Sequence, residues 1–342
     1  MGFMEIMGSK SVRYHAENVM GRADDHPGRA LEYYGSRGET PLRWGGSGAA
    51  SLGLEGAVTD HQCVSIYGEG GAKDPVTGER LVHTKRPGME IVIAAHKSVA
   101  ELGVIGRAED MHAIVDAERD ATLGYLDRLT KVGGGRRGRA TVITKTTGLI
   151  YAHSRHATSR AGDPSPHDHV LVANLTEMLD EKGGFKAPDT SLWRDHLHAA
   201  TMVGRMAAAR KALELGYAIE PDPGPSGKLG HFRIAGVPKE VCDLHSKRAA
   251  EIEVECERTG KDSYRAKGVA AKSPRAHKRH TPIGDLMERW QAEIESAGYS
   301  VRDIQSLVDE AGRRRSRFPT LGYDERRQLV REDLLLAQGT PR

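Results

Sequence analysis

The run HDHVLVANL, residues 167–175, constrains the fold more than any other part of this 342-residue chain, because its apolar and β-branched residues predict a strand. The preceding run ATVITKTTGLIYAHSRHAT, residues 140–158, predicts two strands joined at a Thr-Gly turn. Amphipathic helices are expected at residues 110–129 and 191–216, the second ending at Gly216. These strands and helices interleave without a regular βαβ rhythm. We therefore expect an α+β fold with a central antiparallel sheet flanked by helices.

The rest of the chain predicts further elements of the same kinds. Residues 88–105 read as a strand leading into a helix, residues 217–236 as a hairpin, and residues 28–34 as a short helix. The loop GGSGAASLG lacks the Gly-Lys-Ser/Thr ending of a P-loop, so we expect a turn into a small helix and no ATP site. From about residue 237 onward the sequence is helical and charged, which indicates a mainly helical C-terminal part.

Composition excludes several classes of protein. No segment approaches the roughly 18 apolar residues of a membrane helix, and the N-terminus lacks the apolar region of a secretory signal. Three scattered cysteines fit neither a disulfide framework nor a CxxC zinc site, which favours the reducing cytoplasm. The net charge of +3 is mild, but positive charge is concentrated in Gly- or Pro-containing runs that are either solvated loops or phosphate contacts: residues 131–139, 267–280 and 312–317.

Histidines at the start of the 167–175 strand point to a metal. Residues two apart on a strand share a face, so His167 and His169 would project together, with roughly 6–7 Å between their Cα atoms. The loop that follows His156 is long enough to return it beside this pair. Three imidazoles would leave coordination positions open for a substrate. The alternative is that all three are ordinary polar residues. His196 and His198 are also two apart, but on an expected helix, where they cannot share an ion.

A tyrosine pair, Tyr33 and Tyr34, closes the expected N-terminal helix. A tyrosine hydroxyl can act as a covalent nucleophile toward a metal-polarised phosphate. The alternative is an aromatic pair that only packs the end of the helix.

Together these residues resemble the conjugative relaxases of the MobF type (TrwC/TraI class) within the HUH endonucleases. The resemblance rests on the early Tyr pair, on GMEIVIAAHKSV, and on RHATSRAGDPSPHDHVLVANLT, and it extends over roughly residues 10–300. It implies a palm-like sheet, with the catalytic core at residues 1–240 and a helical, basic segment at 241–342 that closes over DNA within the same relaxase domain. Family members often continue into a helicase, but no Walker A motif is present here, so we expect a relaxase domain alone.

The resemblance also implies a mechanism. His156, His167 and His169 would hold a divalent metal, Mg²⁺ or Mn²⁺, although nitrogen ligands also suit Zn²⁺ or Ni²⁺. Tyr33, with Tyr34 second and Tyr14 third, would attack one strand at an origin of transfer and form a 5′-phosphotyrosyl intermediate that can be rejoined. Glu90 stands where the family has Asp, and would orient a metal-binding His or help to deprotonate the Tyr.

The implied partners are single-stranded DNA with an adjacent hairpin or duplex, accessory relaxosome proteins and type IV secretion proteins, with no membrane insertion. We expect DNA contacts from basic side chains and one stacking aromatic: Arg43, Trp44, Arg136, Arg137, Arg160, Lys272, Arg275, Lys278 and Arg279. Three alternatives stay open: an HUH rolling-circle replication initiator or transposase, a non-catalytic single-strand DNA-binding module with a structural metal, and an unrelated three-His metal hydrolase.

Overall fold

The computed structural model describes residues 3–6, 40–137, 140–181, 183–222, 230–260 and 281–316. Within them, one five-stranded sheet has the order β1-β3-β7-β6-β2, and every neighbouring pair in it is antiparallel. Its strands are β1 (Phe3–Ile6), β2 (Arg43–Gly45), β3 (Gly88–Ala94), β6 (Tyr151–Thr158) and β7 (Pro164–Ala173). The expected α+β fold with a central antiparallel sheet is confirmed.

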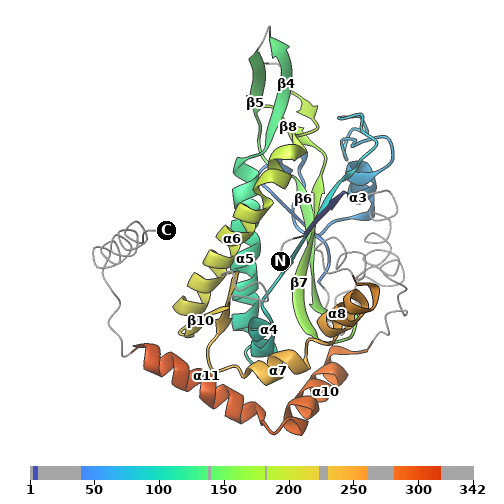
Figure 1. Cartoon of the computed structure of the whole chain (residues 1–342). Coiled ribbons are helices and arrows are strands. Elements are labelled where there is room, and N and C mark those ends of the chain that lie inside the picture. Colours follow the sequence, from blue (N-terminus) through green and yellow to red (C-terminus); the bar gives the residue numbers. More distant parts are fainter. Residues whose placement is uncertain are drawn as a thin grey trace, which may run out of the picture.

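Three two-stranded ribbons accompany this sheet: β4 (Lys131–Arg137) with β5 (Ala140–Lys145), β8 (Thr176–Glu177) with β9 (Phe185–Lys186), and β10 (Ile219–Asp222) with β11 (His231–Ile234). The β10–β11 pair is the hairpin expected at residues 217–236. The β4–β5 ribbon projects from one end of the molecule (Figure 1). This ribbon corrects the expectation of a loop at residues 131–139. The β-branched residues of β5 favour a strand, and the Gly-rich segment pairs with that strand from Lys131 to Arg137.

The described helices are η1 (Ala49–Leu52), α3 (Asp60–Tyr67), α4 (Lys97–Val104), α5 (Ala108–Arg128), α6 (Thr190–Glu214), α7 (Lys239–Leu244), α8 (Lys247–Thr259), α10 (Ile283–Ser296) and α11 (Val301–Ser316). They match the expected small helix after GGSG and the helices at 110–129 and 191–216. Asp189 caps α6 by accepting a hydrogen bond from the Ser191 amide, and Gly216, with φ of +93°, lets the chain turn away after it. The helix expected at residues 28–34 lies outside the described residues.

Helices α5 and α6 lie side by side on one face of the sheet (Figure 1). Alternate residues of β3 and β7, such as Ile91 and Val170, pack there against Leu123 and Leu126 of α5 and Trp193 of α6. The opposite face is covered near β2 by α3 and the loops around it. There the Tyr67 hydroxyl reaches between two strands, donating to the Leu171 carbonyl (2.6 Å) and accepting from the Ala152 amide (3.2 Å). The sheet therefore has two dissimilar faces.

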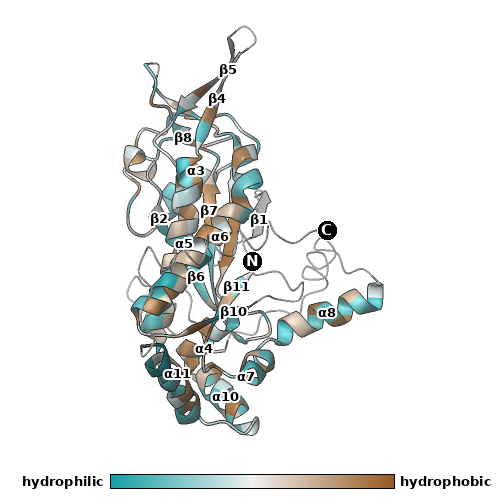
Figure 2. Ribbon diagram, turned by 60° about the vertical axis from the view of Figure 1, so that its left-hand side comes forward, coloured by the Kyte–Doolittle hydropathy of each residue, from teal (hydrophilic) through white to brown (hydrophobic). Residues whose placement is uncertain are grey.

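A third cluster of buried residues joins the C-terminal helices to the rest of the molecule. Val99 and Leu102 of α4 pack with Ile114 of α5, Trp290 of α10 and Ile304 of α11. Figure 2 shows apolar residues concentrated on the central strands and α4, whereas α11 is largely hydrophilic. None of the described helices is long and apolar enough to cross a bilayer. The C-terminal helices thus share a core with the helices that flank the sheet.

Candidate metal centre

The register of two neighbouring strands brings three histidines together. β6 and β7 pair antiparallel, with His156 directly opposite His167 and Ser154 opposite His169. Opposite residues project to the same face, as do residues two apart, so all three imidazoles share one face. Their ring centroids lie 4.6–5.3 Å apart, and one nitrogen from each lies within 4.8 Å of the others. His156 belongs to strand β6, so the connecting loop is only residues 159–163.

The Nδ1 atoms of two of these rings already have hydrogen-bond partners. His169 Nδ1 lies 2.5 Å from a carboxylate oxygen of Glu90, and His167 Nδ1 lies 2.7 Å from the Ser165 carbonyl. Because these oxygens only accept, we assign the proton to Nδ1 in both rings, and in this tautomer the Nε2 atom carries the lone pair that can bind a cation. Glu90 comes from β3, where it is paired with Leu171. Three clustered imidazoles, two of them oriented in this way, fit a divalent cation.

The opposite face of the same strands carries a buried ion pair that the sequence reading missed. Asp168, between the two histidines, is fully buried, and it accepts two hydrogen bonds from the Arg155 guanidinium at 2.8 and 2.6 Å. Arg155 also donates to Asp116 of α5 (2.9 Å). The sequence pattern could have predicted this pair. Arg155 directly precedes His156 and Asp168 directly follows His167, so an antiparallel register that pairs the two histidines also pairs the two charged residues.

The predicted nucleophiles, Tyr33 and Tyr34, lie outside the described residues, as does Tyr14. The nearest described residue is Thr40, whose amide donates to the Arg155 carbonyl (2.9 Å) and whose hydroxyl accepts from the Arg155 amide (2.7 Å). Thr40, six positions after Tyr34, is therefore anchored beside the strand that carries His156.

The predicted DNA contacts are scattered over the molecule. Arg43 is exposed on β2, and Arg160 is exposed in the β6–β7 turn, four positions after His156 along the chain. Arg136 and Arg137 lie on β4 of the projecting ribbon. The four remaining basic residues lie outside the described residues: Lys272, Arg275, Lys278 and Arg279.

Trp44 is placed differently from the expectation. Its side chain is buried, its ring stacks on Tyr67 at 6.0 Å, and its Nε1 donates to Gln62 (2.9 Å). An indole enclosed in this way packs the core beneath α3, which counts against the prediction that it stacks on a DNA base. His196 and His198 lie on α6, as expected, and His196 Nδ1 lies 3.2 Å from the Tyr125 hydroxyl.

Comparison with known proteins identifies the family. The model of the TrwC relaxase family matches residues 8–297. This chain belongs to the TrwC relaxase family. The match includes the histidine cluster, the tyrosine pair and the Trp-containing helix α10.

Known relatives agree with this assignment. The multifunctional conjugation protein TraI of Escherichia coli is 29% identical over 299 residues, which make up 84% of this chain and 16% of that protein. The chain thus spans about one sixth of the length of the curated relatives that it matches. The solved structure of conjugative relaxase TrwC with oriT DNA and bound metal covers 88% of this chain and all of its own, at 23% identity and a TM-score of 0.72. A TrwC complex with a 27-mer DNA that comprises the recognition hairpin and the cleavage site aligns at 22% identity and a TM-score of 0.70.

Proposed function

We propose that this chain is a relaxase that nicks one DNA strand at an origin of transfer and can rejoin it during conjugative transfer. The observation that carries the proposal is the cluster of three histidine nitrogens within 4.8 Å, beside Glu90, in a chain that the relaxase family model matches over residues 8–297. A cluster that fits a metal supports chemistry at a phosphate, and the family supports DNA as the phosphodiester.

Tyr33 is the proposed nucleophile, and Tyr34 is the second choice. Tyr33 lies seven positions before Thr40, so a fully extended chain between them spans at most about 25 Å, and about 22 Å from Tyr34. Because Thr40 is hydrogen-bonded to Arg155, next to His156, this short tether supports either tyrosine as a group able to reach the histidines.

The proposed reaction is a transesterification. The tyrosine hydroxyl gives up its proton and its oxygen forms a bond to phosphorus, while the bond from phosphorus to the 3′ oxygen breaks and the 3′ oxygen takes up a proton. The products are a 5′-phosphotyrosyl link and a free 3′-hydroxyl. Since one phosphoester replaces another, attack by the 3′-hydroxyl on the phosphotyrosine rejoins the strand without an external energy source.

His156, His167 and His169 are the proposed metal ligands, and Glu90 is the residue that orients His169. A divalent cation bound there would neutralise charge on the scissile phosphate. We propose Mg²⁺ or Mn²⁺, with Zn²⁺ or Ni²⁺ as alternatives because imidazole ligands favour softer ions. The 2.5 Å contact supports an orienting role for Glu90, since its carboxylate already accepts the Nδ1 proton of His169.

The proposed DNA contacts divide between the single strand and the duplex. Arg160, exposed in the turn that follows the His156 strand, and Arg43, exposed on β2, would bind phosphates of the single strand. The β4–β5 ribbon would bind the adjacent hairpin or duplex through Arg136 and Arg137, because the major groove admits a two-stranded ribbon. Further phosphate contacts are proposed for the basic run before α10: Lys272, Arg275, Lys278 and Arg279.

Accessory relaxosome proteins and type IV secretion proteins are the proposed macromolecular partners. The cytoplasm is the proposed compartment, which agrees with three buried cysteines that form no disulfide: Cys63, Cys242 and Cys256. We retain residues 1–240 as the proposed catalytic core and residues 241–342 as the segment that closes over DNA.

The test is incubation with labelled single-stranded oligonucleotides from the origin region of the parent element, with Mg²⁺ or Mn²⁺. The wild type should form an adduct that survives denaturant, and Tyr33→Phe should lose it while Tyr34→Phe keeps it. The opposite pattern would transfer the role to Tyr34. Binding of every origin strand without an adduct would instead favour a non-catalytic DNA-binding module. Cleavage at a replication origin or transposon end, and not at an origin of transfer, would favour a replication initiator or transposase.

A further inference from the structure

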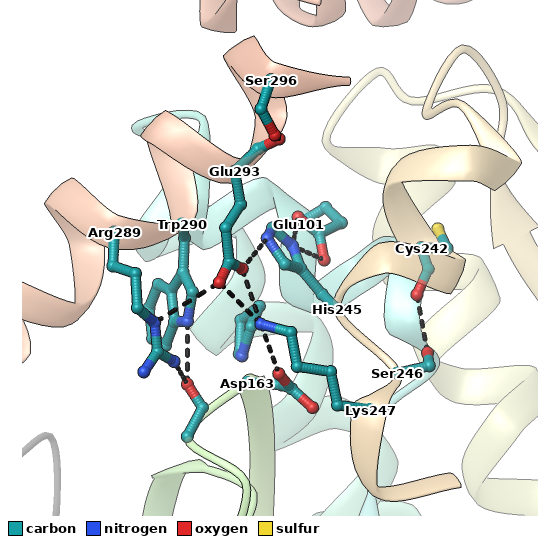
Figure 3. Close-up of polar contacts among 12 residues, drawn as sticks. Glu101, Asp163, Cys242, His245, Ser246, Lys247, Arg289, Trp290, Glu293 and Ser296 are labelled. Carbon is teal, nitrogen blue, oxygen red and sulfur yellow. Dashed lines mark hydrogen bonds and ion pairs between the residues drawn. The ribbon is translucent and has the colours of Figure 1, made fainter. Parts of the chain in front are cut away.

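The turn between the two histidine strands is held from outside by α10. Trp290 Nε1 donates to the Gly162 carbonyl (2.9 Å), and the Arg289 guanidinium donates to the same oxygen (Figure 3). Trp290 is 3% exposed, and Gly162 has a φ of +77°, so this carbonyl is presented by a conformation that favours glycine. Helix α10 thus binds the backbone of the turn through an N–H group on a buried ring.

A second anchor reaches the turn from the start of α8. The Lys247 ammonium lies 3.5 Å from the carboxylate of Asp163 and 2.7–2.8 Å from both carboxylate oxygens of Glu293 on α10. Asp163 is 1% exposed, and its amide donates a hydrogen bond to the Ser159 hydroxyl inside the turn (3.2 Å). A buried carboxylate needs such a partner, because an isolated buried charge is strongly unfavourable.

Fully buried groups fix the base of this arrangement. His245, just before α8, places Nδ1 3.0 Å from both carboxylate oxygens of Glu101 on α4, and its Nε2 lies 3.4 Å from Glu293. Lys97, also on α4, donates to the Pro164 carbonyl at the far end of the turn (2.6 Å). Helices α4, α8 and α10 therefore contact three consecutive residues, Gly162, Asp163 and Pro164. Figure 3 shows the contacts that continue from Asp163 through Lys247 and Glu293 to His245 and Glu101.

We propose that Trp290 and Lys247 are positioning residues for the metal centre. They fix the turn at Gly162 and Asp163, between His156 on one strand and His167 on the next. Rotation or slippage of this turn would move the two strands relative to each other and separate the imidazoles, since a one-residue slip turns every side chain to the other face. The C-terminal helices therefore support the metal centre as well as enclosing DNA.

The catalytic consequence of this inference rests on the proposed function. Its first test is the affinity of the protein for a metal, which does not depend on that function. Trp290→Phe keeps an aromatic ring and removes the N–H donor. The matched control is Trp193→Phe, because Trp193 is also buried (1% exposed) and donates one hydrogen bond, to Thr130 (3.2 Å), but packs against α5 away from the turn. Both variants lose similar packing volume, so a difference in metal affinity reports the contact with Gly162.

Lys247→Met provides a second and independent variant. Its control is Lys211→Met, because Lys211 pairs with Glu214 at 2.9 Å and its side chain is 38% exposed, against 39% for Lys247. Lys247→Arg keeps the charge and should restore most of the metal affinity, which a defect in packing alone would not do. If Trp290→Phe does not fold, the lysine series decides the question.

The measurement is titration of each full-length variant with Co²⁺ alone, followed by absorption spectroscopy. We expect Trp290→Phe and Lys247→Met to weaken Co²⁺ binding about tenfold, at the lower end of what is found for residues that support a metal ligand. Trp193→Phe and Lys211→Met should stay within twofold of the wild type. Equal Co²⁺ affinities for each variant and its control would overturn the inference. Failure of the wild type to form a tyrosyl adduct would overturn the proposed function instead, and the Co²⁺ affinities would still decide the positioning role.

Discussion

Replacing Asp168 with Asn would leave the Arg155 guanidinium buried beside a neutral amide. Asp168 is fully buried and Arg155 is 7% exposed, and two short hydrogen bonds of 2.8 and 2.6 Å join them. Removing one partner of a buried ion pair costs about 3–5 kcal/mol. Asp116 remains 2.9 Å from the guanidinium and compensates part of the charge. We therefore expect the free energy of unfolding to fall by about 3 kcal/mol.

Equilibrium unfolding in urea, followed by circular dichroism, measures this loss. Glu214→Gln is the control, because its ion pair with Arg210 (2.9 Å) is exposed and exposed pairs contribute little. The double variant Arg155→Met, Asp168→Leu should recover most of the stability, since an apolar pair of similar volume can replace a buried ion pair. A fall of less than about 1 kcal/mol in the free energy of unfolding of Asp168→Asn would refute the reasoning that this ion pair between β6 and β7 stabilises the fold.

Three further substitutions test other parts of the structure. Burial raises the pKa of Glu118 from 4.5 to about 7, so the native state keeps a proton that the unfolded chain releases, and stability falls as pH rises from 4.5 to 7. Glu118→Gln should therefore be more stable than the wild type at pH 8, by on the order of 3 kcal/mol, and similar to it at pH 4. Urea unfolding that gives the same difference in stability between variant and wild type at both pH values would contradict this. Glu90→Ala should weaken Co²⁺ binding roughly 10–100-fold in a titration, with DNA affinity retained, because His169 loses its orienting partner. Gly204→Ala should lower the thermal midpoint, since its Cβ would meet Thr122 Oγ1 at 2.0 Å between α5 and α6. Gly124→Ala should not, because its Cβ would meet only the flexible end of Arg128, at 3.8 Å.

Local sequence patterns were sufficient to predict most of the helices and strands. The helices at residues 110–129 and 191–216 and the strands around His156 and His167 are observed within a few residues of their predicted bounds, because periodicity and capping act over one or two turns of chain. The spacing of His167 and His169 places both on one face for the same reason. The Gly-rich, basic run at 131–139 was predicted wrongly as a loop, since pairing with β5 outweighs the weak strand propensity of glycine.

The sequence by itself determined the strands, the helices and the shared face of His167 and His169, because these depend on neighbours in the chain. Only the tertiary structure decided which residues complete the centre. Glu90 reaches His169 from 79 residues away, and Trp290 reaches Gly162 from 128 residues away. Likewise, only packing buried Trp44, and only the register of β6 against β7 placed Asp168 opposite Arg155. Such contacts depend on strand register and on helix packing, which no local pattern specifies.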